Sequence, residues 1–167
     1  MEFRSRKSPR LPCYNYSNCG AYFVTICTHD RCRSLGRICR DDPGGRPTAV
    51  LSPLGQIAAD TCQAIAQKHH VVIDSFVVMP DHIHMILFLP DPLPGKTGSQ
   101  LGKIVGAYKS VVSNQWLKIC KENGTIMGKL WQERYYDHII RNDEDLLNVR
   151  AYIDTNPDRW MMKCENE

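Results

Sequence analysis

Two apolar segments that almost touch in the sequence constrain the fold of this chain most strongly. Residues 71–79 and 82–89 are rich in β-branched and large apolar side chains, and a single Pro-Asp dipeptide separates them. Segments of this kind are typical of strands, and so short a connection joins antiparallel neighbours. The second segment is apolar on both faces beyond its histidines, with Met85 and Leu87 on one face and Ile86 and Phe88 on the other. The sequence therefore predicts a β-hairpin in a sheet that is covered on both faces.

The segments around this hairpin have equally clear periodicities. Residues 22–27 combine aromatic and β-branched side chains and predict a strand. Ser52 followed by Pro53 is a helix-start signal, and the apolar positions that follow predict a helix to about residue 68. After the hairpin, apolar residues in 101–119 recur at i, i+3, i+4 and i+7, which predicts a long helix.

The C-terminal third adds a strand and a helix. Residues 130–141 carry Trp131 and several other large apolar side chains and predict a fourth strand. Asn142 is then an N-cap for a last helix with three acids in its first turn, and Pro157 is expected to end it. The element order is β-α-β-β-α-β-α. We therefore expect an α+β fold, namely a ferredoxin-like antiparallel sheet with two helices on one face and an additional C-terminal helix.

The length and loop pattern predict one domain over residues 1–167. Residues 1–20 are predicted to form a basic N-terminal arm, which includes Arg10. The Gly/Pro-rich segments 41–47 and 90–98 are interpreted as surface loops, because neither half of the chain could bury a full core alone. The net charge of +3 is too small to identify a nucleic-acid partner by itself.

The composition also excludes several classes of protein. The chain has eight cysteines, but no two have the C-x-x-C spacing of a structural zinc site. The charged N-terminus lacks the apolar run of a signal peptide, and no apolar segment approaches the roughly 20 residues of a membrane span. We therefore expect a cytoplasmic protein without disulfides or a membrane segment.

Two histidines and two residues near the C-terminus are candidates for chemistry. His82 and His84 are two apart on a predicted strand, so their imidazoles project to the same side, about 7 Å apart, and could chelate one metal ion. Tyr152 and Asn156 are four apart on the predicted last helix and share one face, at the edge of its apolar stripe. Each residue also has a purely structural explanation, as a hydrogen-bonded histidine, a tyrosine bordering the core, or an asparagine at a helix end.

Four short motifs in a fixed order change this balance. They are Tyr22-Phe23-Val24-Thr25, Met79-Pro80-Asp81-His82-Ile83-His84, Trp131-Gln132-Glu133-Arg134-Tyr135-Tyr136-Asp137-His138 and Tyr152-Ile153-Asp154-Thr155-Asn156-Pro157. The set, with the opening Arg10-Leu11-Pro12, resembles the REP-associated tyrosine transposases. These are relatives of the single-tyrosine insertion-sequence transposases within the HUH (His-hydrophobic-His) nuclease superfamily. The resemblance covers nearly the whole chain.

The resemblance implies a role for each candidate residue. It implies that His82, His84 and Asn156 bind the metal and that Tyr152 is the catalytic nucleophile. At the position of Asn156 the insertion-sequence relatives usually have the longer glutamine, so the helix must lie closer to the metal here or a water must bridge. The resemblance further implies Mg²⁺ or Mn²⁺ as the working ion, a 5′-phosphotyrosine intermediate, and palindromic repeat DNA as the substrate.

Other residues are tentative DNA contacts. Arg10, Lys109, Arg134 and His138 could bind backbone phosphates, although Lys109 could equally be solvated and His138 could pair with a nearby acid. Three aromatic residues near the fourth strand could stack on bases or pack in the core: Trp131, Tyr135 and Tyr136. Asp81 could orient a metal ligand or simply serve the hairpin turn.

We therefore expect a transposase-like enzyme that nicks and rejoins single-stranded or hairpin DNA. Two alternatives remain from the residues alone. One is a non-catalytic single-stranded nucleic-acid-binding module of the RRM type, although the aromatic RNP1 pattern is not found. The other is a metal-binding protein without nuclease activity. The sequence also leaves open a homodimer in which the last helix completes a partner's site.

Overall fold

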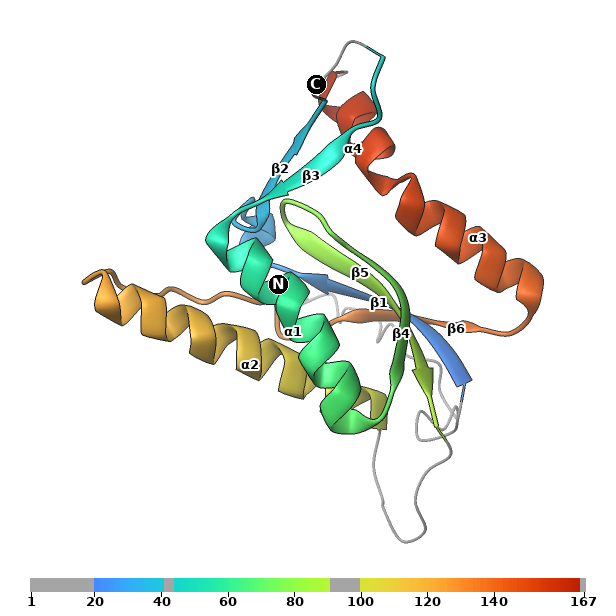
Figure 1. Cartoon of the computed structure of the whole chain (residues 1–167), viewed down its shortest axis with the longest axis horizontal. Coiled ribbons are helices and arrows are strands. Elements are labelled where there is room, and N and C mark those ends of the chain that lie inside the picture. The colour runs from blue at the N-terminus through green and yellow to red at the C-terminus, as the bar shows by residue number, and fades with distance from the viewer. Residues whose placement is uncertain (1–19, 41–43, 91–99, 166–167) are drawn as a thin grey trace, which may run out of the picture.

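A four-stranded antiparallel sheet forms the centre of the molecule, in the order β4-β5-β1-β6 (Figure 1). The computed structural model describes residues 20–40, 44–90 and 100–165. The strands are β1 (Gly20–Cys27), β4 (Val72–Val78), β5 (His82–Leu89) and β6 (Tyr136–Ile140). β4 and β5 form the expected hairpin, and β5 pairs next with β1. This strand order and its connections are those of the expected ferredoxin-like fold.

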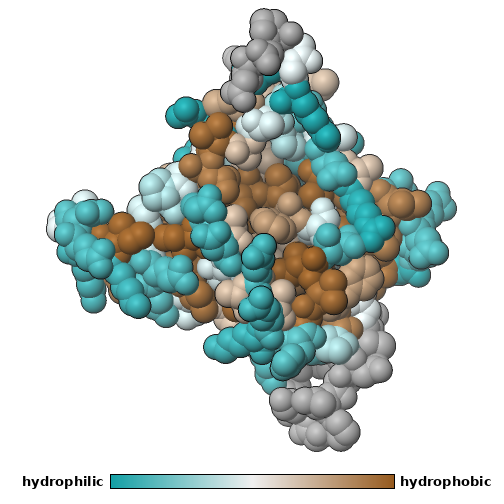
Figure 2. All heavy atoms as spheres, in the orientation of Figure 1, coloured by the Kyte–Doolittle hydropathy of each residue, from teal (hydrophilic) through white to brown (hydrophobic). Residues whose placement is uncertain are grey.

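Two helices pack on one face of this sheet, α1 (Pro53–His69) and α2 (Gln100–Glu122). The Ser52 hydroxyl accepts a hydrogen bond from the Gly55 backbone N–H, which confirms the predicted start of α1. Apolar residues of both helices form one core with the buried face of the strands, and Tyr22 and Ile83 are fully buried there. Hydrophilic side chains follow the outer surfaces of the helices, as expected for amphipathic elements (Figure 2). None of the helices in the described part of the chain could cross a membrane.

A third helix covers the opposite face of the sheet, as the apolar residues on both sides of β5 predicted. This helix is α3 (Asp143–Asp154), and Asn142 caps it by accepting a hydrogen bond from the Asp145 backbone N–H. Ile153 of α3 packs against Ile86 of β5 in a second, smaller core. Helix α3 therefore lies over the sheet of the same chain, on the face of β5 that carries the histidines (Figure 1).

Two predicted element boundaries are wrong. Pro157 does not end the last helix: α3 stops at Asp154, and a further helix, α4 (Asn156–Glu165), begins beyond a break at Thr155. Proline is compatible with the first turn of a helix, where its missing N–H has no partner to lose. The fourth strand is also shorter than predicted, because residues 130–135 are irregular apart from an isolated bridge between Thr28 and Trp131.

A two-stranded ribbon was not predicted from the sequence. It consists of β2 (Gly36–Cys39) and β3 (Thr48–Leu51), which pair as a hairpin across the segment expected to be a surface loop. The ribbon extends away from the main sheet toward α4 and contacts it (Figure 1). Strands of four residues with no clear alternation are too short to give a periodic signal. The ribbon thus packs next to α4 at the C-terminal end of the chain.

Candidate active site

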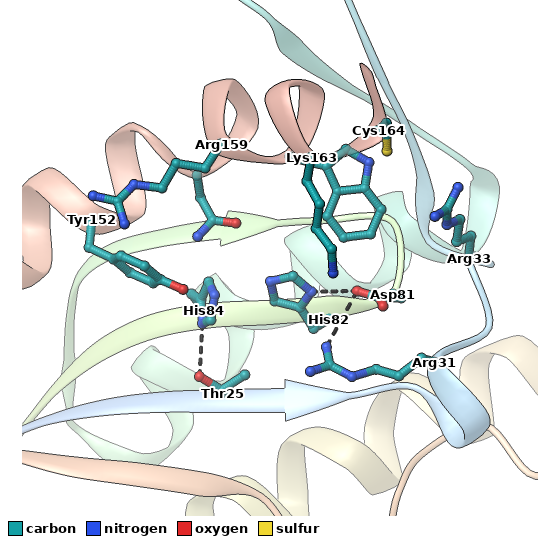
Figure 3. Close-up of a pocket in the computed structure, with 12 residues that line it drawn as sticks. Thr25, Arg31, Arg33, Asp81, His82, His84, Tyr152, Arg159, Lys163 and Cys164 are labelled. Carbon is teal, nitrogen blue, oxygen red and sulfur yellow. Dashed lines mark hydrogen bonds and ion pairs between the residues drawn. The ribbon is translucent and has the colours of Figure 1, made fainter. Parts of the chain in front are cut away.

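A pocket of about 490 Å³ opens where β1, β5, α3 and α4 meet. It is lined by twelve residues, which include both candidate histidines, Tyr152 and Asn156. Figure 3 shows the histidines projecting from β5 toward the helices, with Tyr152 approaching from α3. The four residues singled out in the sequence therefore lie together, although Tyr152 and Asn156 belong to two helices rather than one.

The two histidines are held through the same ring nitrogen. The Nδ1 atom of His82 lies 2.5 Å from an Asp81 carboxylate oxygen, and the Nδ1 atom of His84 lies 2.8 Å from the Thr25 hydroxyl (Figure 3). Both side chains are buried, and their ring centroids are 4.4 Å apart. A carboxylate is only an acceptor, so Nδ1 of His82 donates and Nε2 is the ring nitrogen left without that contact.

The free nitrogen of His84 is an unusual feature of this pocket. Its Nε2 atom is buried and has no hydrogen-bond partner among the described residues. Burial, followed by the nearby charges of His82 and Arg31, lowers the pKa of His84 to about 3. His84 is therefore neutral at physiological pH, and a buried polar atom without a partner is destabilising unless something binds it.

These features fit a metal ligand set. Imidazole nitrogens held by a hydrogen bond through the opposite ring atom are the usual arrangement of metal-binding histidines. Asn156 is buried on the wall of the same pocket and offers an amide oxygen. No group of three His, Cys, Asp or Glu side chains converges in the described part of the chain, so any ion held here would depend on the amide and on ligands from outside the protein.

The hydroxyl of Thr25 gives a direct test of this arrangement. We expect Thr25→Val, which keeps the shape of the side chain but removes its hydroxyl, to weaken Mn²⁺ binding about 10- to 100-fold. The reason is that the His84 ring loses the contact that fixes its orientation. Isothermal titration calorimetry measures the affinity, and Thr48→Val on the exposed side of β3 is the matched control. Equal Mn²⁺ affinity in the two variants would contradict a role for His84 as a ligand held by Thr25.

The ring of Tyr152 packs against His84 and Phe23. The ring meets His84 edge-on with centroids 5.3 Å apart and meets Phe23 edge-on at 5.8 Å. The Arg159 guanidinium lies over the same ring, 5.1 Å from its centroid. In Figure 3 the hydroxyl end of Tyr152 points toward His84. The phenol ring is therefore held at the pocket, with a positive charge beside it.

A bidentate ion pair fastens α3, and with it Tyr152, to the edge of the sheet. Arg150 donates to both carboxylate oxygens of Asp74 on β4, at 2.8 and 2.5 Å. The hydrogen bond from Arg150 lowers the pKa of Asp74, against the opposing effect of burial. An aspartate with a lowered pKa stabilises the fold above its unfolded pKa, near 4, and this contribution is lost as pH falls through the lower folded value.

We expect Asp74→Asn to lower the Tm at pH 7 by an amount of the order of a few degrees. The difference between the variant and the wild type should shrink as pH falls below about 4, because the Asp74 carboxylate takes up a proton first in the unfolded chain and then, at lower pH, in the folded one. Thermal melts followed by circular dichroism measure both effects. Asp154→Asn, an exposed carboxylate on the same helix, is the control. A Tm difference that does not change with pH would show that the ion pair does not stabilise α3.

The junction between α3 and α4 is held by the loop of the β2–β3 ribbon. The Arg46 guanidinium donates to the Asp154 backbone carbonyl at 2.6 Å and lies 3.6 Å from the Asp158 carboxylate. Arg46 thus satisfies a carbonyl at the end of α3 and pairs with an acid in the first turn of α4. The ribbon therefore supports the break that separates Tyr152 from Asn156.

Four cations surround the pocket, and we call them the basic rim: Arg31, Arg33, Arg159 and Lys163. Asp81 is the single carboxylate among the described residues that line it. Arg31 lies 3.5 Å from Asp81, and Arg33 stacks over the ring of Trp160. Such a concentration of positive charge suits a polyanion.

The loop that carries Arg31 and Arg33 is fixed to the β4–β5 turn. The Thr28 hydroxyl and backbone N–H both donate to the Asp81 carbonyl, at 2.9 and 3.0 Å. The basic rim was not predicted from the sequence. Arg159 and Lys163 are four apart, so a helix beyond Pro157 would have revealed them, whereas the two loop arginines have no local signal.

Comparison with known proteins identifies the family. The family model described as "Transposase IS200 like" matches residues 46–156. The chain belongs to the IS200-like transposase family. It therefore belongs among the transposase enzymes, and the expected relationship to the REP-associated tyrosine transposases is also confirmed.

Individual relatives of this transposase support the same assignment. It is 30% identical over 114 residues to the REP-associated tyrosine transposase of Escherichia coli K12, a match that covers 67% of this chain and 59% of that one. It is 31% identical over 172 residues to a Haemophilus influenzae protein of unassigned function, covering 93% and 89% of the two chains. A solved REP-associated tyrosine transposase bound to a REP hairpin shares the fold, with a TM-score of 0.58 at 20% identity over 90% of this chain and 73% of that one.

The three tentative DNA contacts of the transposase that the structure describes lie outside the pocket. The Lys109 ammonium donates to the backbone carbonyls of Gln132, Glu133 and Arg134, at 2.9 to 3.3 Å, so it fixes the irregular segment before β6. Arg134 is exposed in that segment. His138 is exposed and contacts the Asp145 carboxylate of α3, so it pairs with a nearby acid, as the alternative to a DNA contact expected. Arg10 and the N-terminal arm lie outside the described residues.

The three aromatic residues near β6 of the transposase divide between the core and the surface. Trp131 and Tyr135 are buried in the core formed with α1 and α2. Tyr136 is 55% exposed. Asp81 contacts the His82 ring as well as forming the turn.

Proposed function

We propose that this transposase-family enzyme is a metal-dependent endonuclease and strand-transferase for single-stranded DNA that acts through a 5′-phosphotyrosine on Tyr152. The observation that supports this most is the packing of Tyr152 against His84, whose buried Nε2 has no hydrogen-bond partner in the described part of the chain. A phenol, a pair of oriented imidazoles and a basic rim are the parts that such a reaction needs.

The proposed reaction conserves the number of phosphodiester bonds. The Tyr152 oxygen attacks phosphorus and the bond from phosphorus to the 3′-oxygen of the upstream strand breaks. The phenol proton passes to solvent, and the departing oxygen takes up a proton and leaves as a 3′-hydroxyl. The reverse attack by another 3′-hydroxyl rejoins DNA without a nucleotide cofactor. One site can therefore both cut and transfer a strand.

In this proposal His82, His84 and Asn156 hold a divalent ion, either Mg²⁺ or Mn²⁺. When bound, such an ion polarises the phosphate and offsets the charge that develops on its oxygens. Imidazole ligands favour Mn²⁺ over Mg²⁺. Asp81 and Thr25 keep the two imidazoles in place, and the Nδ1 contact of Asp81 leaves Nε2 of His82 free to bind.

The basic rim supports the choice of a DNA substrate. Its four cations outnumber the single carboxylate of the described lining, so backbone phosphates are attracted and binding should weaken as salt rises. The Arg159 guanidinium lies over the Tyr152 ring, 5.1 Å from its centroid, and so places a positive charge beside the proposed nucleophile. The REP hairpin bound by the solved relative makes hairpin or palindromic repeat DNA the proposed substrate class.

The alternative of an RRM-type binding module has less support. Such a module stacks bases on the sheet face that its two helices leave open. In this chain α3 packs over that face, and Ile153 of the helix and Ile86 of β5 are buried between them.

The test is incubation of the wild-type protein with end-labelled hairpin DNA and Mn²⁺, followed by denaturing electrophoresis. We expect a labelled protein–DNA adduct that survives denaturation, and a released strand that ends in a 3′-hydroxyl. Hairpins drawn from repeats near the gene are the first substrates to try. Failure of all single-stranded and hairpin substrates with Mg²⁺ and Mn²⁺ would contradict the proposal and favour the binding module.

A further inference from the structure

Tyr136 is aligned across the strands of the sheet with Thr25 and His84, two residues of the candidate site. It pairs with Thr25 across β6 and β1, and Thr25 pairs with His84 across β1 and β5. Directly paired residues project to the same face of a sheet. The Thr25 hydroxyl already contacts His84, so this row faces the pocket. The Tyr136 side chain therefore projects from the same face as the two histidines.

Tyr136 is a large aromatic side chain that does not pack in the core. It is 55% exposed, whereas Trp131 and Tyr135, the other two aromatic residues of the same segment, are 7% and 9% exposed in the core. Its neighbour two residues along the face, His138, is instead engaged with Asp145 of α3. Helix α3 thus contacts the sheet at His138 and leaves the ring of Tyr136 exposed to solvent.

The spacing relates Tyr136 to the site. Neighbouring strands lie about 4.8 Å apart, so Tyr136 stands two strands, or about 10 Å, from the row position of His84. A strand whose phosphate lies beside Tyr152 and His84 can cross β1 and bring its next base over β6. The basic rim stands elsewhere around the pocket, on α4 and on the loop after β1, so it is available for the backbone.

We propose that Tyr136 is a base-stacking subsite for the unpaired base next to the phosphate that Tyr152 attacks. This inference rests on the proposed nuclease function. Every base has an apolar ring face, so such a contact is tolerant of sequence and selects unpaired DNA over duplex DNA, whose bases are already stacked. The subsite would hold the strand in register, and its residue acts by positioning the substrate.

Binding of a fluorescein-labelled oligothymidylate, measured by anisotropy, tests the stacking without any need for cleavage. Tyr136→Ala and Tyr136→Leu should weaken binding about 5- to 100-fold, while Tyr136→Phe should bind like the wild type. Leucine keeps an apolar side chain on the strand, so its loss of affinity separates stacking from folding. Phe76→Ala, at a half-exposed ring on β4, should have no effect. Equal affinity of the alanine, leucine and phenylalanine variants would overturn the proposal.

A cleaved hairpin then locates the stacked base. Abasic sites are placed one at a time beside the cleaved phosphate, and adduct formation is measured with wild type and Tyr136→Leu. At one position the abasic site should remove the difference between the two proteins, and KM should change more than kcat. A difference that persists at every position would contradict the subsite while leaving the nuclease function intact. Absence of any adduct with wild type would instead overturn the proposed function, and the oligothymidylate result would still decide on stacking.

Discussion

Tyr152→Phe should abolish the covalent protein–DNA adduct while leaving the site folded. Phenylalanine keeps the ring that packs edge-on against His84 and Phe23, so α3 should stay in place. It removes the phenolic oxygen that is the nucleophile of the proposed reaction. We expect strand cleavage to fall by a factor of at least about 10³, with DNA binding changed less than about twofold. Adduct yield on a denaturing gel and anisotropy binding measure the two effects.

A second tyrosine provides the control for this result. Tyr135→Phe removes a hydroxyl from a core tyrosine outside the pocket, so it should retain the adduct. Normal adduct formation by Tyr152→Phe would show that another group is the nucleophile. A parallel loss of DNA binding and of the circular dichroism spectrum would show that Tyr152 acts through the fold instead.

His84→Ala should have the second largest effect, through the metal. The wild-type protein should lose adduct formation in EDTA and regain it with added Mn²⁺. His84→Ala removes one of the two oriented imidazoles, so we expect Mn²⁺ affinity and adduct formation each to fall at least about 100-fold. Titration calorimetry with Mn²⁺ and the adduct assay in saturating Mn²⁺ separate the two losses.

The control for this second prediction is His29→Ala, which removes an imidazole outside the pocket that pairs with Asp30. It should bind Mn²⁺ and form the adduct like the wild type. Unchanged Mn²⁺ affinity in His84→Ala would contradict the proposed ligand set. Adduct formation by the wild type in EDTA would show that the reaction does not require a metal ion.

The elements with long periodic patterns were predictable, since their burial is decided locally. The hairpin of β4 and β5, α1 and α2 each have enough residues for the period of their apolar positions to be unambiguous. The covering of both sheet faces followed from the apolar residues on both sides of β5. The β2–β3 ribbon has strands of only four residues and could not be recognised.

The errors at the C-terminal end have specific physical reasons. A proline can follow the end of a helix or stand in the first turn of one. Pro157 stands in the first turn of α4, and Arg46 satisfies the Asp154 carbonyl at the end of α3 just before it. The predicted strand over residues 130–141 is shortened because three carbonyls of residues 132–134 accept from the Lys109 ammonium, which draws that segment away from the sheet. Both effects are contacts between distant parts of the chain.

The sequence was sufficient to name the residues of the candidate site. It was not sufficient to predict the contacts and charges that surround them. His82, His84, Tyr152 and Asn156 were named from spacing and from the order of the motifs, and the fold brings all four to one pocket. The Thr25 contact of His84 depends on strand register, and the basic rim depends on a loop and an unpredicted helix. The homodimer, and the question of whether a partner's helix completes the site, stay predictions.

The most direct measurement of the central claim is mass spectrometry of the protease-digested adduct. A wild-type adduct formed in Mn²⁺ should yield one modified peptide, with a nucleotide joined through its 5′-phosphate to the hydroxyl of Tyr152. Fragmentation should place the added mass on that tyrosine and on no other residue. A nucleotide found on Tyr136, on Tyr108 or on a serine or cysteine would contradict the account.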